Sequence, residues 1–240
     1  MKNLRQYLMV SVMLLLLGAC SSRPPISDLQ ATYDAYPEYT VILEDMKTEG
    51  NFFQDYYHRY KVVYGEPTGI GDSLAYQSQV SDWVKVEKKQ YQKLEPYLGM
   101  TLAAKTPDGE VSQNQHPPGY QYVGNPQYGQ WRERSDGTSF WEFYGKYALL
   151  STVFNSFRQP VYRSDWDGYR RASQRREPYF GNQKQYGTYG SQTQKTHKTF
   201  FERRQARETL RKQSFSEKVK NRTRRSNMSR SRSRSGGFGK

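Results

Sequence analysis

Cysteine is almost absent from this sequence, in which Cys20 is the only one. No disulfide can therefore form within one molecule, and no metal site can be built from several thiolates. Histidine is also scarce: His58, His116 and His197 stand in three unlike contexts, none of them a known nucleophile signature. Nucleophilic catalysis needs an activated nucleophile beside a base. We therefore expect a non-enzymatic protein with no catalytic residue, no metal and no cofactor.

Long apolar runs are scarce too, and the single clear one lies at residues 8–17, interrupted only by Ser11. Two basic residues, Lys2 and Arg5, precede it, and the small residues Gly18 and Ala19 follow it. A charged start, a short apolar stretch and small residues are typical of a secretory signal, and ten residues are too few to cross a bilayer as a helix. The sequence predicts export, with residues 1–19 as the signal peptide.

The residues at the end of that run, Leu17-Gly18-Ala19-Cys20, resemble the lipobox of bacterial lipoproteins. The resemblance implies that the Cys20 thiol is lipidated, that residues 1–19 are removed and that the new N-terminus is acylated, for example with palmitate. It also implies a cell-envelope protein held to a membrane by lipid. Ser21 follows the cysteine, and in a Gram-negative cell this implies sorting to the periplasmic face of the outer membrane.

A second resemblance concerns the body of the chain. The segments at residues 117–125 and 139–148, and the Ser/Arg-rich ending with residues 236–239, resemble a group of bacterial envelope lipoproteins. That resemblance covers most of the mature chain and implies no activity.

Apolar residues are few overall, since the mean hydropathy is −1.01, but 15% of the residues are aromatic and 21 are tyrosine. Disordered chains are usually poor in aromatics, so part of this chain should pack. The net charge of +14 is uneven. Residues 201–240 hold 14 Lys and Arg against 3 Asp and Glu, whereas residues 24–110 hold 8 against 14. The pattern indicates a mildly acidic body and a strongly basic tail.

The central region predicts an α+β domain at residues 38–160, after a lipidated tether at residues 20–37. Apolar alternation around a Gly-Asn turn predicts a hairpin at residues 39–64 with one buried and one solvated face, although a short helix at residues 51–61 competes with it. The Asp136-Gly137 pair between strand-like runs predicts a second hairpin. Apolar residues at helical spacing predict a core helix at residues 144–157, against which the hairpins pack. Trp141 and Phe154 are predicted core residues.

Beyond residue 160 the apolar period stops, and residues 161–198 are predicted to be a low-complexity Tyr/Gly/Arg linker. Residues 199–240 are predicted to form a basic helix, opened by a Thr199-x-x-Glu202 capping box and reaching about residue 220, and then a disordered Arg/Ser tail. The tail should contact anionic surfaces through nine arginines: Arg203, Arg204, Arg207, Arg211, Arg224, Arg225, Arg230, Arg232 and Arg234.

Two other chemistries have partial signals in the sequence. Asp165-Trp166-Asp167-Gly168 begins like a calcium loop but lacks the later ligands, so a turn is expected. Glu133, Asp136 and Glu142 could supply a carboxylate pair for glycan hydrolysis. We favour an Asp-Gly turn and solvated strand positions for them.

The leading hypothesis is a lipid-anchored envelope protein whose basic tail contacts anionic lipid, lipopolysaccharide or cell-wall polymer. The alternatives are an envelope protein that binds or hydrolyses glycans, with its aromatics as a binding surface, and nonspecific nucleic-acid binding by the Arg/Ser tail. No specific nucleic acid is expected as a partner, because the export signal predicts a location outside the compartment that holds nucleic acid.

Overall fold

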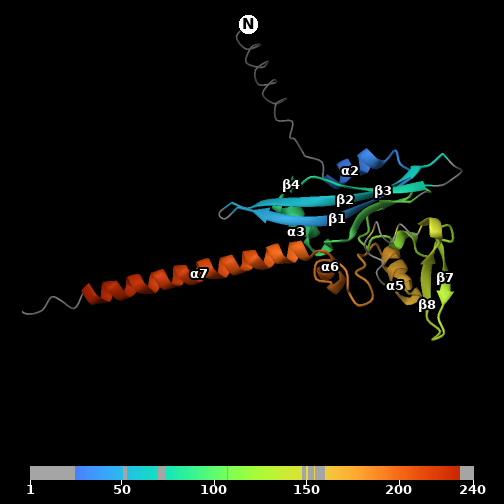
Figure 1. Cartoon of the computed structure of the whole chain (residues 1–240). Helices are drawn as coiled ribbons and strands as arrows, with labels where there is room; N and C mark the ends of the chain where they lie inside the picture. Colours follow the sequence, from blue (N-terminus) through green and yellow to red (C-terminus); the bar gives the residue numbers. More distant parts are fainter. Residues whose placement is uncertain are drawn as a thin grey trace, which may run out of the picture.

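The structure, a computed structural model, describes residues 25–50, 53–69, 74–106, 108–147, 150, 154 and 160–232. The described residues form two antiparallel sheets and separate helices that group along the chain (Figure 1), which confirms the predicted α+β class. The strands are β1 (Glu38–Glu49), β2 (Asp55–Pro67), β3 (Leu74–Val80), β4 (Val84–Val86), β5 (Thr101–Lys105), β6 (Val111–Ser112), β7 (Gly129–Glu133) and β8 (Ser139–Phe143). The helices are α2 (Pro25–Tyr33), α3 (Lys88–Leu94), η1 (Glu95–Tyr97), η2 (Tyr120–Tyr122), η3 (Gly145–Tyr147), α5 (Arg163–Gln174), α6 (Ser191–Thr196) and α7 (Lys198–Arg232).

The predicted first hairpin is confirmed as β1 and β2, which pair antiparallel at the centre of the larger sheet. The strand order is β3-β2-β1-β5-β6, and β4 pairs with the other end of β2. The β-branched start of β1 suits a pleated, buried position. The expectation of one solvated face is wrong for β1, because all residues from Glu38 to Leu43 are buried.

Both faces of this sheet are covered. On one face, Val41 and Leu43 of β1 pack with Tyr33 of α2, Leu94 of α3 and Phe200 of α7. A second group of side chains packs on the opposite face: Ile42, Val63, Tyr122, Tyr128, Tyr147, Leu150 and Phe154. Aromatic residues from loops and from the short helices η2 and η3 therefore cover the face that was expected to contact solvent.

The second predicted hairpin is confirmed as β7 and β8, joined through the Asp-Gly turn. Gly137 adopts a φ of 78°, which favours glycine, and the Asp136 carboxylate accepts hydrogen bonds from the Thr138 amide and hydroxyl. Trp141 is buried against Val161 and Tyr120, as predicted.

The predicted core helix at residues 144–157 is described only in part. Its first residues form η3, and Leu150 and Phe154 are helical and buried, so the prediction for Phe154 is confirmed. Residues 148–149, 151–153 and 155–159 lie outside the described residues.

The predicted linker at residues 161–198 is wrong. This segment contains α5 and α6 and contributes buried side chains, among them Val161, Ala172 and Thr193. Asp165 lies in the first turn of α5 rather than in a free turn, and it is buried. Its carboxylate accepts hydrogen bonds from the Tyr120 and Tyr179 hydroxyls and from the Asn182 amide. The segment therefore folds around a buried polar group, whose contacts are not visible in an apolar period.

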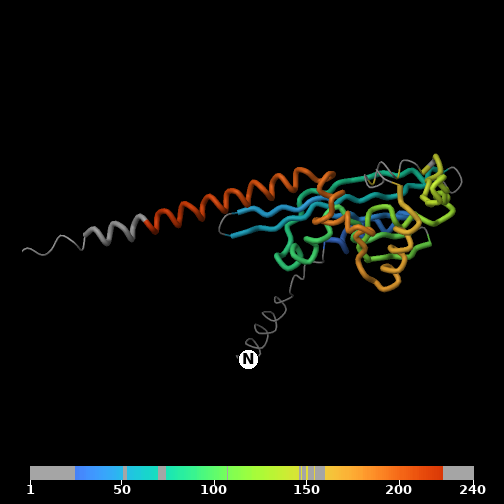
Figure 2. The backbone as a smooth tube through the Cα atoms, turned by 90° about the horizontal axis from the view of Figure 1, so that it is seen from below, coloured from blue at the N-terminus to red at the C-terminus, as the bar shows by residue number. Residues whose placement is uncertain are grey.

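The last element, α7, spans 35 residues and continues to Arg232, beyond the predicted end near residue 220. It begins at Lys198, so Thr199 lies inside the helix and not at the cap. In Figures 1 and 2, α7 runs beside the β1–β2 hairpin and then continues well beyond it. Among the described residues, no helix is both long and apolar enough to cross a membrane. The predicted signal peptide, Cys20 and the ending at residues 233–240 lie outside the described residues.

Candidate anion-binding surface

Four of the predicted contact arginines lie near the start of α7, where the helix crosses β1 and α3. We call residues 198–207 the root and residues 208–232 the arm, because every described residue from Glu208 to Thr223 is exposed. The root holds Arg203, Arg204 and Arg207, and the arm begins just before Arg211. The two parts have different roles, since the root packs on the body and the arm projects from it.

Phe200 fixes the root to the body. Its side chain is 5% exposed and packs in the cluster that covers one face of the main sheet. The ring of Phe201 lies edge-on to it, with 5.0 Å between the ring centroids. His197, just before α7, lies against Gly99, where a Cβ atom would come within 2.8 Å of the imidazole. Burial lowers the pKa of His197, and the nearby Glu44 and Asp45 carboxylates oppose that effect.

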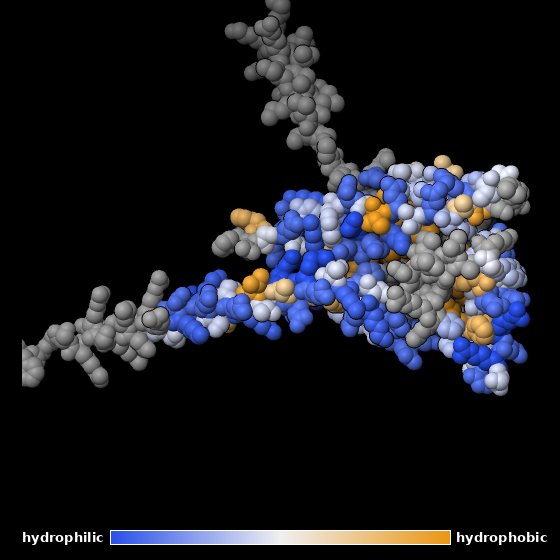
Figure 3. All heavy atoms as spheres, in the orientation of Figure 1, coloured by the Kyte–Doolittle hydropathy of each residue, from blue (hydrophilic) through white to orange (hydrophobic). Residues whose placement is uncertain are grey.

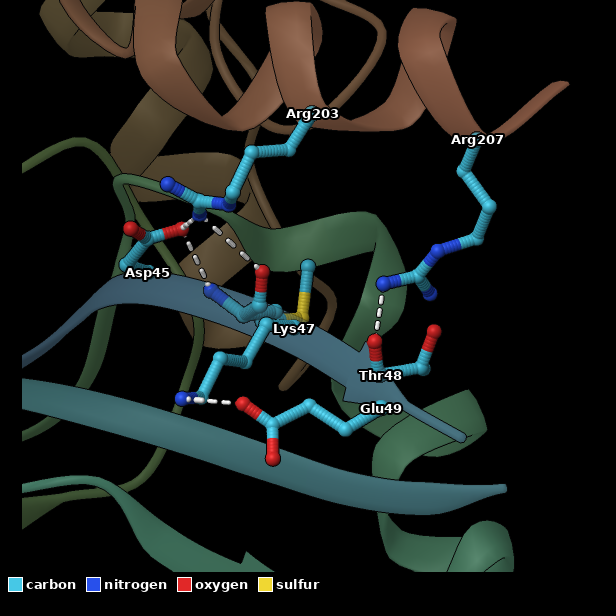
Figure 4. A network of polar contacts seen from close by, with 7 residues as sticks. Asp45, Lys47, Thr48, Glu49, Arg203 and Arg207 are labelled. Carbon is cyan, nitrogen blue, oxygen red and sulfur yellow. Dashed lines mark hydrogen bonds and ion pairs between the residues drawn. The ribbon is translucent and has the colours of Figure 1, made fainter. Parts of the chain in front are cut away.

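Polar contacts hold the root to β1 (Figure 4). The guanidinium of Arg203 lies 2.6 Å from a carboxylate oxygen of Asp45, whose side chain is only 15% exposed. The same oxygen accepts a hydrogen bond from the Met46 amide. Arg207 donates to the main-chain carbonyl of Thr48. Two of the predicted contact arginines are therefore engaged within the molecule.

A bulge in β1 gives these contacts their geometry. The pairing register between β1 and β2 shifts between Leu43 and Asp45, so that Glu44 is the extra residue. A bulge redirects the side chains that follow it. After this one, Met46 is buried in the sheet core, and Asp45 is hydrogen-bonded to α7.

Arg204 lies on a neighbouring position of the root, near two carboxylates. Its guanidinium nitrogens are 3.8 Å from Glu95 and 3.7 Å from Glu208. Contacts of this length between partly exposed groups contribute little to stability. Close by, burial and Glu95 raise the pKa of the Tyr91 phenol, and Arg207 and Arg204 oppose that rise.

Two cavities lie between α7 and the body. The first, of about 240 Å³, is bounded by the root, by β1 and by Tyr91 and Glu95. The second, of about 670 Å³, is a shallow depression open to solvent, bounded by the start of β2, by Lys88 and by Phe53, which is 92% exposed. Arg211 lines both cavities. We call this pair of cavities the groove.

From Glu208 to Thr223 the surface of the arm is mainly polar, with scattered apolar side chains. Figure 3 shows mainly hydrophilic residues along it, with a small hydrophobic area. Leu210, Phe215 and Val219 are exposed, and they are separated by five and four residues. Residues 208–232 hold nine Lys and Arg against two Asp and Glu. A helix without an apolar stripe is marginal alone in water, so a partner would stabilise the arm.

The remaining predicted contact residues fall in different places. Arg224, Arg225, Arg230 and Arg232 lie on the helical backbone of the arm, whereas Arg234 and Cys20 lie outside the described residues. The arginine list omitted exposed basic residues of the arm: Lys212, Lys218, Lys220 and Arg222. Their spacing along the predicted helix was the available signal, because residues three and four apart are neighbours on a helix surface.

Three other titratable side chains of the body, His58, His116 and Glu38, are buried. Burial lowers the pKa of both His58 and His116 to about 4, and in each ring Nε2 is buried without a hydrogen-bond partner. Burial raises the pKa of Glu38, against the effect of hydrogen bonds from three tyrosines. In the part of the chain that the structure describes, no three His, Cys, Asp or Glu side chains come together as metal ligands would.

The carboxylates considered for glycan hydrolysis lie on the β7–β8 hairpin. Glu142 is 2.7 Å from Arg132, which lowers its pKa, and hydrogen bonds from Thr138 lower the pKa of Asp136. Glu133 is exposed near the end of β7. Neither lowered pKa suits a general acid, which needs a raised one.

Comparison with protein-family models, with curated proteins and with solved structures finds no match to this chain. The resemblance to lipoproteins therefore depends on the sequence alone.

Proposed function

We propose that the chain is a lipid-anchored, non-enzymatic protein of the cell envelope whose basic C-terminal helix contacts an anionic surface or polymer. The observation that carries the proposal is the arm, a helix that is exposed at residues 208–223 and that holds nine basic and two acidic residues. Each Lys or Arg near an anionic membrane contributes about 1 kcal/mol, reduced by salt. Binding at the arm would also supply the partner that an isolated helix lacks.

The position of the root supports a role beside the membrane. Tyr33 of α2 and Phe200 of the root belong to the same buried cluster, so both elements pack on the main sheet. Cys20 is five residues before Pro25, a span of at most about 18 Å. The 25 residues of the arm extend about 37 Å as a helix. Lipid on Cys20 would thus hold the arm close to the membrane surface or to polymers beside it.

Lipidation is tested by intact mass and detergent partitioning of the wild-type chain and of Cys20→Ala. We expect the wild type to lose residues 1–19, gain acyl mass and enter the detergent phase, and the variant to do none of these. A wild type that keeps residues 1–19, or a variant that is processed identically, would refute the lipid anchor.

Anion binding is tested on mature residues 20–240 carrying Cys20→Ser, so that no lipid contributes. We expect retention on an anionic matrix that weakens steeply with salt, and loss of retention when the chain ends at residue 207. Retention that ignores salt, or that survives removal of the arm, would refute a charged contact made by the arm.

A further inference from the structure

The basic residues of α7 are not spread evenly around the helix. Five of them recur at separations of three, four, seven and four residues: Arg204, Arg207, Arg211, Lys218 and Arg222. At about 100° per residue, they fall within about 60° of one another on the helix surface. We call this line of cations the stripe. It extends about 27 Å along the helix axis and contains no acidic residue.

The stripe continues the side of the helix that faces the body. Phe200 falls within the same angular range and is buried against the main sheet. Arg204 and Arg207 contact the body, and Arg211 lines both cavities of the groove. Lys88 of α3 adds a cation to the second cavity, where Asp55 is offset by a 2.8 Å contact with Lys85. The stripe therefore begins in the groove and continues along the exposed arm.

The rest of the arm does not resemble a membrane-binding helix. An interfacial helix buries a continuous apolar face opposite its charged one. Leu210 lies about 90° from the centre of the stripe on one side, and Phe215 and Val219 lie about 50° and 90° from it on the other. These three side chains flank the cations and form no separate apolar face. A straight, narrow row of charge matches a linear ligand better than a flat lipid surface.

We propose that the stripe binds a linear polymer of repeating phosphates, which lies along the arm with one end in the groove. This inference rests on the proposed function, because it identifies which anionic partner the arm contacts. The phosphate oxygens accept hydrogen bonds from Arg211, Lys218 and Arg222, which are exposed. Neutralised phosphates release their counterions, so affinity falls with salt in proportion to the number of contacts.

The chain offers a matched pair of variants. Arg211→Gln/Lys218→Gln removes two cations from the stripe. Lys212→Gln/Lys220→Gln removes two exposed lysines that lie about 110° and 170° from the centre of the stripe. Both variants lower the net charge by the same amount, and all four positions are exposed, so neither should disturb the fold.

The probe is long-chain inorganic polyphosphate, titrated into mature residues 20–240 carrying Cys20→Ser at several salt concentrations. We expect the stripe variant to bind about tenfold more weakly and the control variant less than threefold more weakly. The slope of log affinity against log salt should decrease by about 1.4 for the stripe variant, which loses two phosphate contacts. Parallel titrations use orthophosphate and vesicles containing phosphatidylglycerol.

The outcomes separate this inference from the proposed function. Equal losses in the two variants would overturn the stripe and leave a diffuse electrostatic contact of the arm. Vesicles bound more tightly than polyphosphate would overturn the linear polymer in favour of a lipid surface. Orthophosphate that competes at equal phosphate concentration would also overturn it, because a linear array gains from linked contacts. No salt-dependent binding to any probe would refute both proposals.

Discussion

Phe200 offers the sharpest test of whether the root of α7 belongs to the folded body. Its ring is buried in the cluster that joins α2, α3 and the main sheet. Truncation of a buried phenylalanine to alanine costs about 3–5 kcal/mol, because apolar contacts are lost and a cavity remains. The ion pair between Arg203 and Asp45 adds at most about 1 kcal/mol at this partly exposed position. Phe200 should therefore dominate the attachment of α7.

Phe215→Ala is the matched control, since it makes the same substitution in the same helix at a side chain that is 70% exposed. Alanine favours helix, so this variant should melt at or slightly above the wild-type temperature. At about 2–4 °C per kcal/mol for a domain of this size, Phe200→Ala should melt about 6–20 °C lower. The assay is thermal unfolding followed by circular dichroism. If Phe200→Ala and Phe215→Ala melt together, α7 does not pack on the sheet as described.

Three further predictions follow from the body. Asp165→Asn should lower the free energy of unfolding by about 1–3 kcal/mol in denaturant titration, because an amide cannot accept all the hydrogen bonds made to the carboxylate. Asp167→Asn is the control at a partly exposed carboxylate of the same helix, and equal losses in the two variants would contradict the network. The melting temperature should fall as pH drops from about 6.5 to about 4, because the unfolded chain binds protons at His58 and His116 that the native state does not; the fall should be smaller in His58→Gln, and an identical profile would refute this account. Limited trypsin digestion should cut first within residues 211–225 and leave residues 161–198 attached to the body. Early loss of residues 161–198 would instead support the prediction that they are a linker.

Local sequence chemistry predicted the two hairpins well. The Asp136-Gly137 turn needs only the Asp136 carboxylate as an acceptor and a glycine that can adopt a positive φ, and both residue types can be read from the sequence. The β1–β2 hairpin is similarly marked by its β-branched and aromatic runs. Part of the second layer over β1 was predicted, since Leu150 and Phe154 lie in the expected core helix. Tyr122 of η2 and Tyr128 of a loop were missed because the segment that carries them has no regular period.

The segment at residues 161–198 was missed for a related reason. Its burial depends on individual groups with distant partners, as when the Trp166 indole donates to the carbonyl of Val123, 43 residues away. Asp165 likewise depends on Tyr120. Periodicity detects a continuous apolar face. In this segment α5 has a short one, with Trp166, Tyr169 and Ala172 at helical spacing, and the rest of the segment has no regular period. A tyrosine-rich sequence that looks like low complexity can therefore pack when each hydroxyl has a buried acceptor.

In the candidate site, the sequence does not show which basic residues contact the body. The arginine content marks the basic region. It does not distinguish Arg203 and Arg207, which contact the body, from exposed arginines further along α7. The partner of Arg203 is Asp45, 158 residues earlier, directed there by a bulge that the β1 sequence does not reveal. Once the root is fixed by such contacts, helical geometry alone determines which cations of the arm share the stripe. The fold therefore places part of the excess positive charge on one side of α7. The paired variants test whether cations on that side contribute more to binding than cations elsewhere on the arm.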